Sequence, residues 1–354
     1  MSAGCVRYLF VWDLETRKDV SRHRGHLGAV HDLLVTDEGR SLISCSNDRT
    51  CREWTILAPA EPQVLEGQGS GAYDTLRLGA DALASAHGDG RIRIWDLGTG
   101  RIRLTLEGHP SEVFALAASP DRKRLASIDL RGLIILWDAH TGAPLRRLEG
   151  HNGWGMALAL SADGRRLCSG GQDKLLHVWD ADTGAGLRKH PVPDSVFSLV
   201  TADDRLLVGL NSGRILVWDP EGTRVVETLA AHEKCASGLS LSPDRKTLAS
   251  SGMDRRIILW SARNGSWTRV RTLEFHGAWV SKVRFSPDGR HFAAASDDHS
   301  VTLWKTGAPS PLRVFHTRKE ALTVDFVGPE PRLLVGDERR FLLHRLALPE
   351  AGWT

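Results

Sequence analysis

GHNGWGMALALSADGRRLCSGGQDKLLHVWD, residues 150–180, is one copy of a unit that recurs along the chain. In this copy His151, Ser169 and Asp173 precede Trp179 by 28, 10 and 6 residues, and the same offsets return in other copies. The recurrence of four residue types at fixed spacing indicates an internal repeat, which is typical of solenoids and propellers.

Tryptophans mark the repeat and stand about 42 residues apart, a period that suits four short strands with their turns. The marking positions are Trp12, Trp54, Trp95, Trp137, Trp179, Trp218, Trp260 and Trp304, with His344 in the ninth place. Short apolar runs alternate with turn sequences such as SPDR at 119–122 and DAHTG at 138–142. Pro, Asp and Gly fit tight turns, and no unit contains ten residues with helical periodicity.

We therefore predict an all-β fold, a single propeller over residues 1–354 with eight four-stranded blades, or seven as the alternative. Stacking the sheets in a ring buries both faces of each sheet and leaves no unpaired end sheet. The last unit has three strands, so the prediction closes the ring by pairing residues 6–24 with it. The predicted units are 29–66, 72–107, 112–149, 153–190, 195–230, 236–274, 279–315 and 321–348.

Composition gives weaker indications of function. The net charge of +3 is only mildly basic, and the five cysteines include no C-x-x-C pair, so neither a disulfide framework nor a zinc site is indicated. No apolar run reaches the roughly 18 residues of a membrane span, and the N-terminus does not have the pattern of a signal peptide. We expect a cytoplasmic protein without metal or cofactor.

The Trp-Asp pairs and Gly-His pairs of the repeat resemble those of the WD-repeat (WD40) β-propeller family, in the form of bacterial tandem WD proteins. The pairs begin at Trp12, Trp95, Trp137, Trp179 and Trp218 and end at His26, His109 and His151. The resemblance covers nearly the whole chain and implies a buried hydrogen-bonded set of His, Ser, Asp and Trp in each blade. Three blades carry all four residues: His26, Ser44, Asp48 and Trp54; His151, Ser169, Asp173 and Trp179; His232, Ser250, Asp254 and Trp260.

The other units depart from this pattern. Arg131 stands in place of Asp in the third unit, Val208 and Ser212 interrupt the fifth, and Ala294 replaces Ser in the seventh. In the second unit, Gln68 lies one residue away from the His position. We expect these blades to depend more on packing.

His, Ser and Asp are also the residues of a hydrolase triad. A triad is needed once, whereas this set recurs with a Trp at fixed offset, so we predict a structural role and no enzyme. Basic groups such as 122–124 and 255–256 fall in turns expected on opposite faces of a propeller. Direct nucleic-acid binding is therefore the alternative hypothesis and not the leading one.

The resemblance implies a protein-interaction scaffold, acting as an adaptor or as a sensor or regulatory subunit of a bacterial complex. Trp154 and Trp279 occupy one equivalent place, three residues after His151 and His276, where the innermost strand begins. Exposed tryptophans there would anchor a partner, although both rings could instead fold between blades. The predicted partner-binding residues are Trp154, Trp279, Glu112, Lys234, Glu320, Arg131 and Arg255. The basic members among them favour an acidic partner segment.

Overall fold

The computed structural model is all-β and divides into two compact units, Met1–Pro62 and Gln63–Thr354. It describes residues 8–12, 19–24, 30–36, 41–46, 51–55, 63–65, 72–79, 81–97, 99–202, 205–219, 224–263, 265–317, 320–327, 332–337 and 341–345. Side chains are described for residues 72–326, outside the same gaps, and for 333 and 334.

The first unit contains two small antiparallel sheets. Strand β1 (Tyr8–Trp12) pairs with β2 (Asp19–Arg24). A three-stranded sheet follows, formed by β3 (Val30–Thr36), β4 (Ser41–Ser46) and β5 (Cys51–Thr55).

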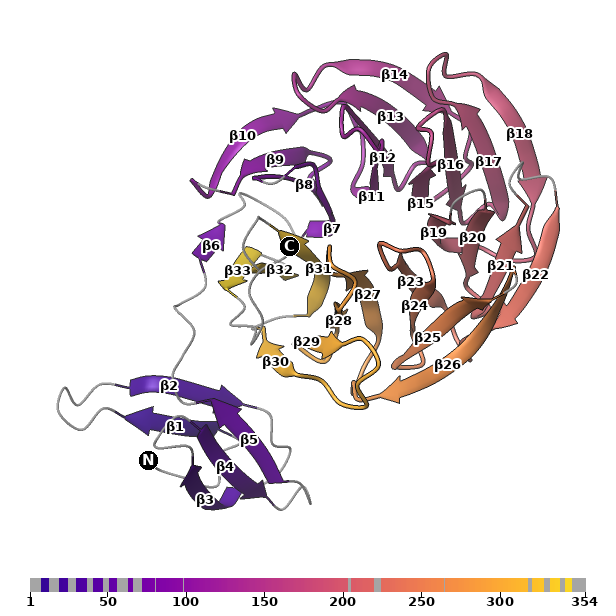
Figure 1. The fold of residues 1–354 in the computed structure, drawn as a ribbon. Coiled ribbons are helices and arrows are strands. Elements are labelled where there is room, and N and C mark those ends of the chain that lie inside the picture. Colours follow the sequence, from indigo (N-terminus) through magenta and orange to yellow (C-terminus); the bar gives the residue numbers. More distant parts are fainter. Residues whose placement is uncertain are drawn as a thin grey trace. The chain divides into compact units, whose positions relative to one another are not determined.

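Within the described part of the second unit, six blades consist of four consecutive antiparallel strands each, arranged around a common centre (Figure 1). Their first and second strands are β7 (Ala72–Arg77), β8 (Ala82–His87), β11 (Val113–Ala118), β12 (Arg124–Asp129), β15 (Gly155–Leu160), β16 (Arg166–Gly171), β19 (Val196–Ala202), β20 (Arg205–Leu210), β23 (Ala236–Leu241), β24 (Thr247–Gly252), β27 (Val280–Phe285) and β28 (His291–Ser296). Their third and fourth strands are β9 (Ile92–Asp96), β10 (Arg101–Leu106), β13 (Leu133–Asp138), β14 (Pro144–Glu149), β17 (Leu175–Asp180), β18 (Gly186–Pro191), β21 (Arg214–Trp218), β22 (Val225–Ala230), β25 (Arg256–Arg263), β26 (Ser266–Glu274), β29 (Ser300–Lys305) and β30 (Arg313–His316). The first strand of each blade lies innermost and contacts the first strands of its neighbours.

A further four-stranded sheet is composite. It joins β31 (Ala321–Val327), β32 (Arg332–Asp337) and β33 (Phe341–Arg345) to the short strand β6 (Gln63–Leu65), with Leu342 opposite Val64. Phe326 packs against the β27–β30 blade, and Leu334 packs with Trp95 of the β7–β10 blade. The composite sheet therefore contacts blades on both of its sides.

Two predictions about blades are wrong. Eight blades are not found, and the alternative of seven is not matched by blades of consecutive strands, of which the described chain has six. The fourth strand of the last sheet also differs from the expected 6–24 stretch, because β1 and β2 pair with each other and β6 occupies the free edge of β33. An unpaired strand edge accepts any strand of suitable register, and the repeat pattern does not say which one reaches it.

The turns explain why the repeat punctuates the strands so regularly. In the turn after β11, the Ser119 hydroxyl donates to Asp121 Oδ1 at 2.5 Å and accepts the Arg124 amide at 3.0 Å. In the turn after β13, Asp138 Oδ1 accepts the Thr141 amide at 2.8 Å, and Gly142 adopts φ 78°, a left-handed conformation that glycine tolerates without strain.

The core lies between blades. The marking tryptophans whose side chains the structure describes pack on the sheet of the preceding blade: Trp137 on Ile92 and Ile94, and Trp179 on Ile134 and Leu136. The outermost strands are mostly exposed, as in β14 and β18. Among the described residues, no helix is long and apolar enough to span a bilayer.

Candidate interaction site

The predicted His–Ser–Asp–Trp set of the β15–β18 blade is assembled as a hydrogen-bonded chain. Trp179 Nε1 donates to Ser169 Oγ at 2.9 Å, and His151 Nε2 lies 2.7 Å from the same hydroxyl. His151 Nδ1 lies 3.0 Å from Asp173. Because the indole N–H can only donate, the hydroxyl accepts it and donates to His151 Nε2, which leaves the Nδ1 proton for the carboxylate.

The β23–β26 blade repeats this arrangement. Trp260 Nε1 donates to Ser250 Oγ at 3.1 Å, and His232 bridges Ser250 at 3.0 Å and Asp254 at 2.9 Å. Gly252 is required here because a Cβ at that residue would lie 2.6 Å from His232 Nδ1. The third predicted set, His26, Ser44, Asp48 and Trp54, lies outside the residues whose side chains the structure describes.

Sequence reasoning missed the set of the β11–β14 blade, where Arg131 occupies the usual Asp position. Asp129, two residues earlier, lies 3.1 Å from His109 Nδ1, and Ser127 bridges His109 Nε2 at 2.6 Å and Trp137 Nε1 at 2.8 Å. The signal was present in the sequence. The second strand ends in Asp129, at the position where the β23–β26 blade has Gly252. The carboxylate is therefore supplied by the last residue of the strand and not by the turn that follows it.

The set of the β27–β30 blade was also missed, because Ala294 replaces the usual Ser. Thr302 lies directly opposite Ala294 across the ladder between β28 and β29. Its hydroxyl accepts Trp304 Nε1 at 2.8 Å and lies 2.8 Å from His276 Nε2, while Asp298 lies 2.9 Å from His276 Nδ1. The hydroxyl is supplied by the third strand of the blade and not by the second, and the chain of hydrogen bonds is preserved.

The β7–β10 blade uses a third solution. Ser85 accepts Trp95 Nε1 at 2.7 Å, and the same hydroxyl lies 2.7 Å from Nε2 of His87, which is two residues further along the same strand. The Arg93 guanidinium, nearly fully buried, pairs with Asp89 at 2.6 Å. A histidine from the second strand thus replaces the one expected from the loop before the blade.

The β19–β22 blade has lost the arrangement. Val208 and Leu216 face each other across the ladder, so no hydroxyl lies beneath the tryptophan. Trp218 Nε1 and His190 Nε2 are buried without a hydrogen-bond partner, although the two rings remain in contact with centroids 5.2 Å apart. This blade is held by packing, as expected from its sequence.

The geometry gives the sets a structural role. Ser169 is fully buried and its oxygen accepts the indole proton, so a substrate carbonyl has no access to it. Burial acts to raise the pKa of Asp298, but the hydrogen bond and charge of His276, with Ser300 and the Gly277 amide, outweigh burial and lower the pKa to about 2. The carboxylate therefore stays ionised and holds the histidine in one orientation.

A second buried histidine lies beside the β15–β18 set. The His177 ring stacks on His151 with centroids 4.2 Å apart, and neither of its nitrogens has a hydrogen-bond partner. Burial, with the nearby His151 and Lys189, lowers the pKa of His177 to about 4. His151, Asp173 and His177 are close enough to share a metal ion. However, both His151 nitrogens already serve the hydrogen-bonded set, so a metal would have to displace it.

The two tryptophans predicted as anchors occupy equivalent places. The Trp154 carbonyl accepts the Gln172 amide at 2.8 Å, and the Trp279 carbonyl accepts the Asp297 amide at 2.9 Å. Their side chains differ. Trp154 is 52% exposed, whereas Trp279 is half-buried and its Nε1 has no partner.

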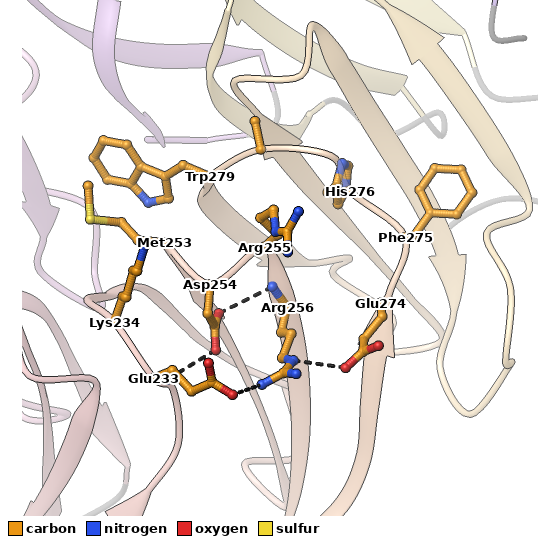
Figure 2. Close-up of a pocket in the computed structure, with 11 residues that line it drawn as sticks. Glu233, Lys234, Met253, Asp254, Arg255, Arg256, Glu274, Phe275, His276 and Trp279 are labelled. Carbon is orange, nitrogen blue, oxygen red and sulfur yellow. Dashed lines mark hydrogen bonds and ion pairs between the residues drawn. The ribbon is translucent and has the colours of Figure 1, made fainter. Parts of the chain in front are cut away.

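Trp279 borders a cavity of about 520 Å³ between the β23–β26 and β27–β30 blades (Figure 2). Met253 and Phe275 line the same cavity and are 39% and 42% exposed. The lining is mixed, because Met253, Phe275, Ala278 and Trp279 are its apolar members and the other seven residues are charged or polar.

Charges around this cavity fall into a paired and an unpaired group. Arg256 is bound on both sides, to Glu233 at 2.6 Å and to Glu274 at 2.8 Å. Lys234 and Arg255 line the cavity without an ion-pair partner among the described residues. Arg255 has φ 71° at a turn position that Gly90, Gly132 and Gly213 fill in three other blades, and Lys174 and His299 fill in two more with φ 59° and 64°.

The remaining predicted binding residues lie apart from this cavity. Arg131 lines a separate cavity of about 490 Å³ with Glu149 and Lys189. Glu112 accepts the Ser111 hydroxyl at 2.5 Å, which chiefly lowers its pKa, and Glu320 is half-buried beside Asp297. Of the seven predicted residues, the structure brings together Trp279, Lys234 and Arg255.

Several basic groups considered for nucleic-acid binding are already engaged. Arg124 donates to Asp182 at 2.6 Å and to the Gly164 carbonyl at 2.7 Å, and Arg256 has its two glutamates. Cys168 and Cys235 are buried, and desolvation raises the pKa of both thiols to about 12. They are small apolar core residues here.

Comparison with known proteins places the chain in a family. Five segments match the WD domain, G-beta repeat (WD40), at residues 17–55, 100–138, 142–180, 223–261 and 267–305, together just over half of the chain. The chain therefore belongs to the WD40 repeat family. Propellers of this family are generally non-catalytic protein-interaction scaffolds.

Individual relatives match over limited stretches. Coronin-7 of Mus musculus is 55% identical over 51 residues, which is 14% of this chain and 6% of coronin-7. The nuclear distribution protein PAC1-2 of Uncinocarpus reesii is 31% identical over 151 residues, 36% of this chain and 33% of that protein. The chain thus spans a third or less of these relatives. They are eukaryotic proteins, and the expected bacterial type is not supported.

Proposed function

We propose that this protein is a non-catalytic scaffold that binds a protein segment at the cavity between the β23–β26 and β27–β30 blades. The observation that carries the proposal is the grouping of half-exposed apolar side chains with two unpaired cations around one hollow. Aromatic side chains and methionine are enriched at the centres of interfaces, because their large apolar area is removed from water.

The charges favour an acidic segment with a large apolar side chain. Lys234 and Arg255 are the cations free to pair with an incoming carboxylate, whereas Arg256 is shared between Glu233 and Glu274 and its single charge offsets one of the two. Trp154, at the equivalent place three blades earlier, is proposed as a second contact of the same partner or complex. We further propose a regulatory role within a cytoplasmic assembly.

The test is affinity capture from native lysate, comparing wild type with Arg255→Glu and with the pair Trp154→Ala and Trp279→Ala. We expect both variants to lose the proteins that wild type retains, while their melting curves stay unchanged. Arg245→Glu is the matched control, since Arg245 also has a left-handed conformation (φ 57°) but does not line this cavity. Equal capture by wild type and Arg255→Glu would contradict the proposed site.

We also propose that the composite sheet closes the ring. The contacts of Phe326 and Leu334 with different blades support this, as does the 2.9 Å hydrogen bond between the Thr75 and Thr323 hydroxyls of β7 and β31. Val64→Pro would remove a backbone donor from β6. We expect it to lower the melting temperature, and an unchanged value would contradict closure through this strand.

A further inference from the structure

The inner strands line a central channel with two unlike walls. Each inner strand of the second unit has a register shift after its first residue in its pairing with the second strand. Such bulges change the direction in which the following side chains point. In β11 and β15 the third and fifth residues are all alanines, namely Ala115, Ala117, Ala157 and Ala159. In β27 they are Lys282 and Arg284, and Asp325 and Asp74 occupy matching places in β31 and β7. Charge is thus confined to three neighbouring inner strands.

Two cations share one carboxylate oxygen on the charged wall. Asp74 Oδ1 lies 2.8 Å from Lys282 Nζ and 3.2 Å from Arg284 Nη2. The other oxygen of Asp74 accepts the Leu116 amide at 3.0 Å. Asp74 Oδ1 also accepts the Thr75 amide at 3.0 Å, so this one carboxylate leaves N–H groups of the ammonium and the guanidinium unused.

A third cation reaches the same space. Arg122, in the turn between β11 and β12, lines a cavity of about 370 Å³ together with Asp74, Lys282 and Arg284. Its guanidinium has no side-chain partner in the described part of the chain, and desolvation lowers its pKa, although the residue as a whole stays exposed. Asp325, the second carboxylate, lies within ion-pair distance of no lysine or arginine that the structure describes, and accepts the Phe326 amide at 2.8 Å.

We propose that this channel cavity binds phosphate or a phosphate monoester, held by Arg122, Lys282 and Arg284. Three cations face two carboxylates, so the cavity has surplus positive charge in a region of limited solvent. Guanidinium groups bind phosphate oxygens by paired hydrogen bonds, which are strengthened by charge. The small alanine side chains of the adjoining strands β11 and β15 leave room for the body of a small ester.

The backbone at Arg122 permits a clean substitution. Arg122 adopts φ 59° in its turn, where Gly164 and Gly289 occupy the matching position of other blades with φ 70° and 69°. A left-handed conformation is costly for a residue with a Cβ. Arg122→Gly therefore removes the cation without straining the backbone, which separates stability from binding.

The first experiment is isothermal titration calorimetry of the full chain with inorganic phosphate and with phenyl phosphate, in a buffer free of other oxyanions. We expect binding at millimolar concentrations or below. Arg122→Gly should weaken it about tenfold, the loss of one charge-assisted bond, while the melting temperature stays equal or rises. Arg284→Gln should weaken it similarly.

The matched control is Arg245→Gly, because Arg245 has φ 57° in the same turn of the β23–β26 blade but does not line the cavity. It should relieve the same backbone strain and leave the affinity unchanged. If phenyl phosphate binds more tightly than inorganic phosphate, the ligand is a phosphate ester whose organic group contacts the alanines. If inorganic phosphate binds more tightly, the ligand is the free ion. Binding of neither probe, or an equal loss in Arg245→Gly, would overturn the proposal.

The pH dependence gives an independent readout. Burial raises the pKa of Asp325 to about 6, against the opposing effect of Arg284 and Arg122, and Asp74 raises it further. Below pH 6 this carboxyl is neutral, and the cavity gains net positive charge. Sulfate, whose charge is constant from pH 5 to 8, should therefore bind several-fold more tightly at pH 5 than at pH 8. Asp325→Asn should remove that dependence, and a flat wild-type profile would contradict this assignment.

Discussion

The β27–β30 and β19–β22 blades have both lost the usual serine beneath the marking tryptophan, with opposite results. In the first, Thr302 supplies a hydroxyl from the opposite side of the ladder, and Trp304, His276 and Asp298 stay connected. In the second, Leu216 occupies that facing place, and Trp218 and His190 keep buried nitrogens without partners. A hydrogen-bonded set therefore depends on a position in space, which either of two strands can fill.

The largest effect expected is that of removing a marking tryptophan. Trp179→Ala should lower the free energy of unfolding by about 3–5 kcal/mol, the usual cost of deleting a large buried ring. Trp218→Ala should cost about 1 kcal/mol less, because no hydrogen bond is lost with it. Urea unfolding of both variants measures the difference. An unchanged melting temperature in Trp179→Ala would contradict the proposed structural role.

The transferred hydroxyl can be tested directly. Thr302→Val keeps the side-chain shape but leaves Trp304 Nε1 and His276 Nε2 without partners, which should cost about 2 kcal/mol. Ala294→Ser should restore much of that stability in the Thr302→Val background, because it returns the hydroxyl to the usual strand. Thermal unfolding of the single and double variants is the measurement, and failure of the rescue would contradict the equivalence of the two positions.

His177 should make the β15–β18 blade sensitive to acid. Its folded-state pKa is about 4, below the ordinary value of 6.5, so its contribution to stability is present above pH 6.5 and lost as the pH falls toward 4. His177→Ile, which introduces the residue found at the matching Ile135 and Ile258, should stabilise the protein by about 2 kcal/mol more at pH 5 than at pH 8. Equal effects at both pH values, measured by urea unfolding, would show that His177 is not buried in neutral form.

The smallest effect expected is a gain. Val208→Thr would place a hydroxyl opposite Leu216, beneath Trp218, where Trp218 and His190 both need a partner. We expect about 1 kcal/mol of added stability, the net value of a typical buried hydrogen bond. Leu210→Thr, in the same strand but outside this arrangement, is the control and should destabilise. A loss of stability in Val208→Thr would mean that the rings cannot reach the new hydroxyl.

Local pattern was enough to predict much of this protein. Tryptophans at a constant period, turn residues between short apolar runs, and the three full sets of His, Ser, Asp and Trp predicted an all-β propeller of the WD40 type. Each of these features depends on residues close in sequence, where strand alternation and turn chemistry act. Trp154 and Trp279 could be assigned to one equivalent place for the same reason.

Tertiary structure decided the rest, because pairing and burial join residues that are distant in the chain. The edge of β33 is completed by β6 and not by the expected N-terminal strands, and the blade count follows from that pairing. Thr302 and Asp129 replace missing members of their sets only because strand register brings them there. Likewise, Trp279 is half-buried at the edge of a cavity whereas the equivalent Trp154 is 52% exposed, since the side chains around each place come from different blades.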